Sequence, residues 1–381
     1  MRKRHHFFWW LLRPLIIVFL WCKFGYTFKT AKGLPDNYIV LSNHATDYDP
    51  LLVSASFPRQ MYFVASEHIA RWKRAFKWLD YVFAPIMRYK GTVAASTVVE
   101  VLRRVRKGAN VAIFAEGART WDGVTGPILP STAKLIKSAR CGLVTYKLVG
   151  GHFISPMWSG SNSRRGYCHG EVVHVYTKEQ VAAMSQEELY EAITRDLQED
   201  AYARQEREPH DYRGKRLAEG LENLLFICPQ CSGYDTFATS DDTLTCKKCG
   251  MSARFTTRAM LEDAPFATVK EFSDWQNERV TADADSGAVY RASGGTLATV
   301  RQHVETPLAS GEVSLDGRFL RCGDAAVAVA DISDMAMHGK RALVFSAADT
   351  YYELVLSDGA NALKFWLYYL ACIKKEPQKN E

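Results

Sequence analysis

The sequence predicts an α/β fold for residues 31–220 of this 381-residue chain, with a mixed, largely parallel sheet flanked by helices. Apolar runs typical of buried strands recur through this segment, and amphipathic or polar runs with helical spacing separate them. Such alternation favours a parallel sheet, because parallel strands need long crossover connections. The expected strands are 38–42, 61–65, 110–115, 142–149 and 171–177, and the expected helices are 50–57, 67–82, 96–107, 130–140 and 178–208.

Residues 1–30 predict a membrane-associated segment. The apolar run 7–22 would make a helix of about 24 Å, which is shorter than the roughly 30 Å hydrocarbon core, and Arg13 and Pro14 interrupt it. No small-residue cleavage site follows, and basic residues flank both ends, so no clear orientation emerges. A kinked helix that enters one leaflet from the cytoplasmic face of the cell membrane fits best. A signal peptide and a full span remain alternatives.

Charge is distributed unevenly along the chain. Residues 1–220 carry 32 Lys and Arg against 20 Asp and Glu, whereas residues 221–381 carry 16 against 22. The basic part suggests an anionic partner, such as a membrane surface, a phosphorylated substrate or nucleic acid. The expected helices 67–82 and 96–107 are basic and would face anionic lipid or donor phosphates, or simply solvent. The acidic second part argues against a nucleic-acid partner.

Four of the nine cysteines form two Cys-x2-Cys pairs separated by fourteen residues. Two such pairs predict a tetrahedral zinc site that stabilises a small ribbon, here residues 221–260. A redox pair or unrelated thiols would be the alternative, and zinc thiolates favour a reducing compartment. The other cysteines read as ordinary buried or membrane-facing thiols. The predicted zinc ligands are Cys228, Cys231, Cys246 and Cys249.

The last part of the chain predicts a small β domain. Short alternating runs recur through residues 291–381, and an apolar helix is expected at 361–373. Strands closed by one helix suggest a β-barrel or sandwich capped by that helix, an architecture that weakly resembles a pleckstrin-homology domain. Residues 261–290 are expected to form a linker, with a short helix at 266–278 and a loop at 281–287.

His44 and Asp49 are the first candidate catalytic residues. They follow the expected apolar strand 38–42. A histidine hydrogen-bonded to a carboxylate can take a proton from a hydroxyl group at neutral pH. Asp47 is a competing partner for His44. Asp49 also precedes Pro50, so it could cap the following helix, either instead of holding His44 or in addition to it. A lone histidine would by default be structural.

A second candidate segment follows the expected strand 110–115. Glu116, Gly117 and Arg119 lie directly after it, where glycine allows a close backbone approach and arginine suits bidentate phosphate contacts. Arg88 also follows an apolar run and could grip the same phosphate. A surface turn and a solvated arginine are the alternatives. Both motifs fall at carboxyl ends of strands, where α/β sheets usually bind ligands.

His44-x4-Asp49, then Arg88, then Phe-x-Glu-Gly-x-Arg at 114–119 together resemble the glycerolipid acyltransferases, specifically a bacterial branch of the 1-acylglycerol-3-phosphate (lysophosphatidate) acyltransferase family. The resemblance covers roughly residues 35–180. It implies that His44 is the base, that Asp49 orients it, and that Arg88, Glu116, Gly117 and Arg119 bind the glycerol phosphate. It implies an acyl-CoA or acyl-carrier-protein donor, phospholipid biosynthesis, and no cofactor for the chemistry.

Three positions depart from the family pattern: Met87, Ala115 and Ala118. None removes a catalytic group, but they bear on the acceptor. The expected function is therefore acyl transfer to lysophosphatidate, which forms phosphatidate. The alternatives are another lysophospholipid acceptor and a non-catalytic lipid-binding scaffold whose C-terminal domains do the work.

Overall fold

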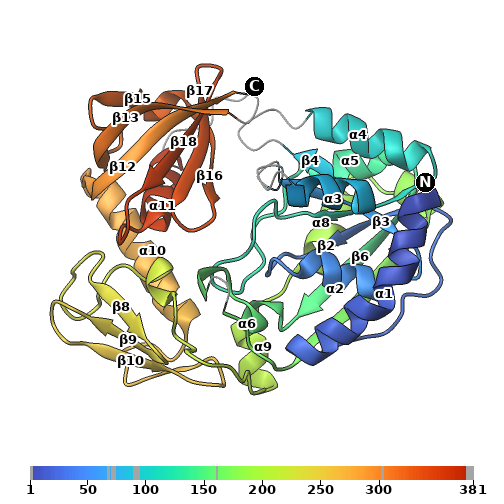
Figure 1. Ribbon diagram of the computed structural model, residues 1–381, viewed down its shortest axis with the longest axis horizontal. Helices are drawn as coiled ribbons and strands as arrows, with labels where there is room; N and C mark the ends of the chain where they lie inside the picture. Colours follow the sequence, from blue (N-terminus) through green and yellow to red (C-terminus); the bar gives the residue numbers. More distant parts are fainter. Residues whose placement is uncertain are drawn as a thin grey trace. The chain divides into compact units, whose positions relative to one another are not determined.

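The computed structural model describes residues 3–66, 69, 74–88, 95–159, 162–301 and 304–374 (Figure 1). The chain forms two compact units. Residues 1–89, 94–215 and 257–259 build the first, and residues 216–256 and 260–381 with the short segment 90–93 build the second.

The first unit contains a mixed, largely parallel seven-stranded sheet with the order β1-β7-β6-β2-β5-β3-β4. Among its described strands, β6 and β7 form the only antiparallel pair. The predicted α/β core is therefore present. The strands are β1 (Tyr26–Phe28), β2 (Tyr38–Ser42), β3 (Met61–Ser66), β4 (Ile86–Arg88), β5 (Asn110–Phe114), β6 (Gly142–Val149) and β7 (Cys168–Tyr176).

Helices cover both faces of this sheet. Ile39 and Leu41 of β2 pack with apolar residues of α4, α5 and α8. The Tyr38 ring packs on Phe57, which directly follows α2, and α2 itself packs on β6 and β7. Strand β2 is buried along its whole length, as its unbroken apolar run requires. The helices are α2 (Asp49–Ser56), α3 (Arg74–Phe83), α4 (Ala95–Arg106), α5 (Ser131–Ala139), α6 (Gly151–Ile154), α7 (Lys178–Ala183), α8 (Gln186–Leu197) and α9 (Ala201–Arg207), with a 3-10 turn at Met157–Ser159.

The long helix predicted over residues 178–208 is wrong, because three shorter helices replace it. Thr177 and Ser185 each cap a new helix by accepting the backbone N–H three residues on, and Asp200 does the same for α9. Such side chains favour helix caps over helix interiors, so the polar segment 178–208 is divided into separate helices at these residues. The helix predicted at 67–82 begins at Arg74, and residues 67, 68 and 70–73 lie outside the described residues.

Helix α1 (Lys3–Phe24) is longer than the predicted 16-residue run and contains Pro14. Within the part of the chain that the structure describes, it is the helix long and apolar enough to cross a membrane by length and composition. It packs against α2 and α3 along the edge of the unit (Figure 1). Arg13 donates to the Ala55 carbonyl, and Lys23 donates to the Tyr48 hydroxyl at 2.8 Å. The helix is thus fastened to the domain along its length.

The second unit begins with a small antiparallel sheet of order β11-β10-β9-β8, which carries the cysteine pairs. Its strands are β8 (Phe237–Ser240), β9 (Thr243–Cys246), β10 (Ser252–Phe255) and β11 (Leu261–Glu262), and a 3-10 turn at Leu221–Asn223 precedes them. The loop predicted at 281–287 is wrong, because helix α10 (Val269–Ser286) runs through it. A Thr268–Glu271 capping box starts this helix, and Gly287 ends it in a left-handed conformation.

A seven-stranded antiparallel sheet follows, with the order β15-β14-β13-β12-β18-β17-β16, and α11 (Ala362–Ile373) packs on it. It is a curled sheet with a helix, as the sequence predicts in outline (Figure 1). Strand β12 contains Gly294 and Gly295, and its pairing with β13 shifts register beside them. The strands are β12 (Tyr290–Arg301), β13 (Val304–Leu315), β14 (Phe319–Cys322), β15 (Ala325–Ala328), β16 (Ile332–His338), β17 (Ala342–Ala347) and β18 (Thr350–Leu356), with a 3-10 turn at Val329–Asp331.

Candidate active site

Two neighbouring parallel strands bring the two predicted motifs together. Strand β2 pairs with β5, with Ser42 opposite Phe114, so both strands end at the same edge of the sheet. His44 follows the first strand and Glu116 follows the second. The backbone N–H of Thr120 donates to the His44 carbonyl at 3.0 Å, which joins the two loops. The motifs are separate in sequence and form one site in space.

His44 and Asp49 form a close pair. Nδ1 of His44 lies 2.7 Å from Oδ2 of Asp49, which is completely buried, while the His44 side chain keeps 20% of its surface exposed. The carboxylate accepts the proton on Nδ1, so Nε2 remains as the basic nitrogen. The ring also stacks on Phe114, with centroids 4.2 Å apart. The arrangement fixes a partly exposed imidazole, and a group of this kind can serve as a general base.

The helix-cap interpretation of Asp49 is wrong. Helix α2 begins at Asp49 itself, Tyr48 occupies the N-cap position, and that position makes no side-chain cap bond. Oδ2 of Asp49 instead accepts the backbone N–H groups of Ala45 at 2.7 Å and Thr46 at 2.9 Å. These bonds turn the carboxylate back toward the preceding loop. One oxygen therefore holds both the loop and the imidazole.

Asp47, the competing partner for His44, pairs with another residue. Its carboxylate lies 2.7 Å from Nη1 of Arg119 and is mostly exposed. The Arg119 guanidinium is thereby held beside the loop that carries His44.

The buried Glu116 side chain holds two backbone segments of the site. Its Oε1 accepts the backbone N–H of His44 at 2.6 Å, and its Oε2 accepts the backbone N–H of Gly126 at 2.7 Å. Burial raises the pKa of Glu116 to about 8, although the two N–H groups act in the opposite direction. With both oxygens engaged by the backbone, this geometry favours a positioning role over the predicted phosphate contact.

Arg88 lies against Gly117. A Cβ atom at Gly117 would stand 2.8 Å from Nη1 of Arg88, and the glycine has a φ of +73°. The position therefore requires glycine both for its backbone conformation and for the guanidinium beside it. Arg88 therefore lies beside the loop that carries Glu116, Gly117 and Arg119.

Two residues at the site were missed by the sequence reasoning. The Asn43 side chain exchanges two hydrogen bonds with the backbone of Leu148, at 2.8 and 2.9 Å, and so ties the His44 loop to β6. His152 lines a small cavity of about 10 Å³ with His44 and Glu116, which is room for about one water. Complete burial, aided by Arg164, lowers the pKa of His152 to about 3, so this ring is neutral. Asn43 sits within the motif and could have been noticed, but His152 has no local signal.

The four predicted zinc ligands converge in the second unit. The Sγ atoms of Cys228, Cys231, Cys246 and Cys249 all lie within 4.8 Å of one another. Two pairs are 3.6 and 3.8 Å apart. Zn–S bonds of about 2.3 Å in a tetrahedron give an S–S edge of about 3.8 Å, so the four thiols fit zinc.

Residues 26–158 match the family model described as Acyltransferase. This stretch contains His44, Asp49, Arg88 and the 116–119 segment. It is therefore an acyltransferase-family domain, and the protein is an O-acyltransferase. Among solved structures, the chain is similar to the 1-acyl-sn-glycerophosphate (LPA) acyltransferase PlsC from Thermotoga maritima, at 18% identity and a TM-score of 0.44, covering 52% of this chain and 80% of that one.

The N-terminal PH domain of the human ARAP2 protein is similar to a quarter of the chain, at 10% identity and a TM-score of 0.21, and 88% of that domain is covered. No curated protein matches the chain. The family assignment rests on the family match and on the geometry of His44 and Asp49.

Proposed function

We propose that this protein transfers a fatty acyl group from acyl-CoA or acyl-carrier protein to the free hydroxyl of 1-acylglycerol 3-phosphate, forming phosphatidate. The observation that carries the proposal is the His44–Asp49 pair, at 2.7 Å with the carboxylate buried. It stands beside two arginines, and a basic site of this kind suits a phosphorylated alcohol.

The chemistry requires one proton relay. Nε2 of His44 takes the proton of the acceptor hydroxyl as its oxygen attacks the thioester carbonyl. Asp49 stabilises the imidazolium that forms. The tetrahedral intermediate collapses, the carbon–sulfur bond breaks, and His44 returns the proton to the departing thiolate. The acyl group thus passes directly to oxygen, without an acyl-enzyme.

Arg88, Arg119 and the backbone at Gly117 are proposed to hold the acceptor phosphate, and Glu116 to fix the loop behind them. A radiolabelled acyl-transfer assay tests this. Lysophosphatidate is compared with neutral and zwitterionic lysolipids, using both donor types. Transfer to lysophosphatidate should dominate. Preference for another lysolipid would reassign the acceptor, and lipid binding without any turnover would favour the scaffold alternative.

Arg119→Ala tests the phosphate assignment separately. It should raise the KM for lysophosphatidate about tenfold or more and leave the donor KM nearly unchanged, because one charge-assisted contact is lost. Arg106→Ala, at an exposed arginine of α4, is the matched control. Equal effects on acceptor and donor would contradict the assignment.

Helix α1 is proposed to rest in one leaflet at the cytoplasmic face of the membrane. Trp9, Leu20 and Phe24 are buried against the domain, so that side cannot face lipid. The opposite side exposes large apolar residues, as expected for an interfacial helix. A helix fastened to a folded domain along its length is poorly suited to a full span. The exposed residues are Phe7, Trp10, Leu11, Leu15, Val18, Phe19 and Trp21.

The four-cysteine site is proposed to hold a structural zinc ion. Cys228, Cys231, Cys246 and Cys249 would hold it, and the ion would supply a cross-link to a small sheet with little core of its own. No step of the acyl transfer requires it. Elemental analysis of purified protein should find about one zinc per chain, and a chain free of metal with full thermal stability would contradict the proposal.

A further inference from the structure

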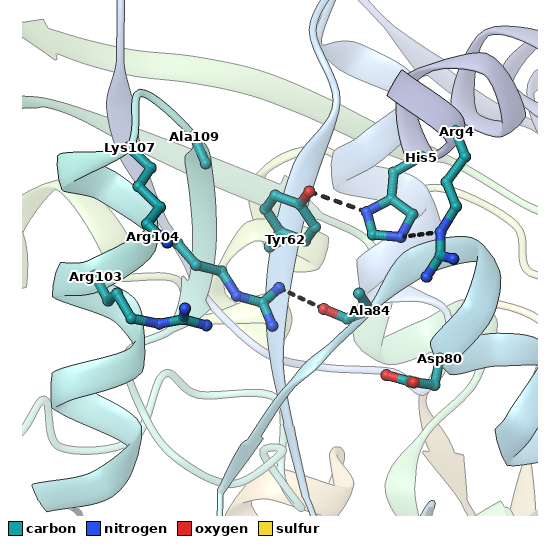
Figure 2. A pocket seen from close by; sticks show the side chains of 9 residues that line it. All are labelled: Arg4, His5, Tyr62, Asp80, Ala84, Arg103, Arg104, Lys107 and Ala109. Carbon is teal, nitrogen blue, oxygen red and sulfur yellow. Dashed lines mark hydrogen bonds between the residues drawn. The ribbon is translucent and has the colours of Figure 1, made fainter. Parts of the chain in front are cut away.

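A cationic pocket of about 350 Å³ lies in the first unit, away from His44. In Figure 2, Arg103 and Arg104 of helix α4 and Lys107, directly after it, lie on one side. Arg4 of helix α1 lies on the other, with Tyr62 between them. Among the described residues, Asp80 is the one acidic residue that lines it. Four cations face one carboxylate, so the pocket suits an anion.

This pocket lies at the opposite edge of the sheet from the acyl-transfer site. Tyr62 is near the start of β3, and Ala109 directly precedes β5. His44 belongs to the other edge, beside Phe114 at the end of β5. The five residues of β5 separate the two edges by about 13 Å. The pocket is therefore distinct from the site proposed for the acceptor.

Aromatic rings hold two of the guanidinium groups in place. Arg104 lies over the Tyr62 ring, 4.5 Å from its centroid, and Arg4 lies over the Tyr81 ring at 4.3 Å. Nη1 of Arg104 also donates to the Ala84 carbonyl. Guanidinium groups fixed in this way lose less entropy when they bind an anion. The pocket is thus ordered before any ligand arrives.

Glu100 reduces the charge of the pocket without cancelling it. Its carboxylate pairs with both Arg103 and Arg104, at 2.7 and 2.6 Å. Arg4 and Lys107 make no ion pair with it. The remaining excess of positive charge favours a group such as a phosphate over a neutral ligand.

The pocket borders the apolar surface proposed to enter the membrane. Tyr81, on which Arg4 stacks, is half exposed, and so is Trp78 one turn earlier in α3. The Phe8 ring of α1 contacts the Tyr81 ring at 5.9 Å between centroids. Phe7 and Trp10 of α1 are exposed beside it. Aromatic side chains next to basic ones are typical of a protein surface at lipid headgroups.

We propose that this pocket binds the phosphate of an anionic lipid headgroup and thereby anchors the N-terminal end of α1 at the bilayer surface. The proposal rests on the membrane association proposed above, and not on the acyl-transfer chemistry. A phosphate of the acyl donor has the same chemistry, so the test must separate the two sources.

The test compares two double variants of equal charge change in the full-length protein. Arg103→Gln with Lys107→Gln removes two exposed cations from the pocket. Arg106→Gln with Lys134→Gln removes two exposed cations outside it. Binding is measured by co-sedimentation with phosphatidylcholine vesicles, with and without phosphatidylglycerol, and by calorimetry with coenzyme A in the absence of vesicles.

If only unspecific electrostatic attraction acted, both variants would lose the same affinity for anionic vesicles, about fivefold for each cation removed. The pocket predicts a loss at least about tenfold greater for the Arg103/Lys107 variant than for the control, with no change on pure phosphatidylcholine and none for coenzyme A. Equal losses would overturn the proposal. Normal vesicle binding with weakened coenzyme A binding would also overturn it, because the pocket would then serve the donor.

Failure of the proposed function would be visible separately. Acyl transfer to lysophosphatidate in detergent micelles is assayed with the same proteins, and the Arg103/Lys107 variant should keep the wild-type rate there. If the wild type transferred no acyl group yet bound anionic vesicles through the pocket, the pocket would stand without the acceptor assignment.

Discussion

Asp49→Asn isolates the contribution of the carboxylate charge to the proposed base. The change keeps the size of the side chain, and its carbonyl oxygen can still accept from Nδ1 of His44 and from the Ala45 and Thr46 N–H groups. What disappears is the negative charge beside the imidazolium. With charge centres about 4 Å apart and an effective dielectric constant of about 20, the attraction between the carboxylate and the imidazolium is about 4 kcal/mol.

A loss of about 4 kcal/mol in the transition state corresponds to a fall in kcat of about a thousandfold. The stability cost should be smaller. Oδ1 of Asp49 is buried and has no hydrogen-bond partner among the described residues, so the new amide would be buried there unsatisfied, at about 1–3 kcal/mol. Initial rates of labelled acyl transfer and thermal unfolding of the same preparation measure the two effects.

Asp47→Asn is the matched control, because it makes the same chemical change two residues away at a mostly exposed side chain. Its kcat should stay within about threefold of wild type, with a modest change in acceptor KM. The reasoning is refuted if Asp49→Asn keeps a kcat within threefold of wild type, or if Asp47→Asn loses as much as Asp49→Asn.

Three further predictions concern pH, backbone and metal. Burial raises the pKa of Glu116 in the folded protein to about 8, so the folded protein holds a proton that the unfolded chain releases near pH 4.5. The free energy of unfolding should therefore fall between about pH 5 and 8, by at most about 5 kcal/mol. Chemical unfolding measured across this pH range should show the fall, and Glu116→Gln should reduce it. An unchanged slope would contradict the burial argument. Gly117→Ala should raise the acceptor KM, because the new Cβ would displace Arg88. Gly33 has a similar positive φ, but no atom lies within 4 Å of a Cβ placed there, so Gly33→Ala should lower stability and leave the acceptor KM unchanged. Equal acceptor KM values in the two variants would refute this. Chelation should lower the unfolding temperature of the second unit, and Cys231→Ser should reproduce this while Cys22→Ser should not.

Features that depend on a short stretch of chain could be predicted from local sequence patterns. The Cys-x2-Cys pairs meet in space because each knuckle already fixes two thiols, and the strand 38–42 is recognisable because its apolar run is unbroken. His44 and Asp49 are close in sequence, so their pairing was predictable. Asp49 as a helix cap was wrong, since the cap pattern could not show that the carboxylate turns back to Ala45.

Contacts between distant segments could not be predicted from the sequence. Glu116 accepts the backbone N–H of His44, 72 residues away, and nothing in either motif specifies that bond. Gln276 binds the backbone of Phe226 and so links α10 to the ribbon, which helps explain why a segment expected to be a linker is a helix. The cationic pocket gathers α1 and α4 around Tyr62, and only the fold brings them together.

His44→Ala is the most direct measurement of the central claim that His44 is the general base of a direct acyl transfer. Transfer of a labelled acyl group to lysophosphatidate is followed in purified, folded protein under saturating donor and acceptor. A rate reduced by about 10²–10⁴-fold, with donor and acceptor binding retained, is the predicted result. Transfer within about threefold of the wild-type rate would contradict the account.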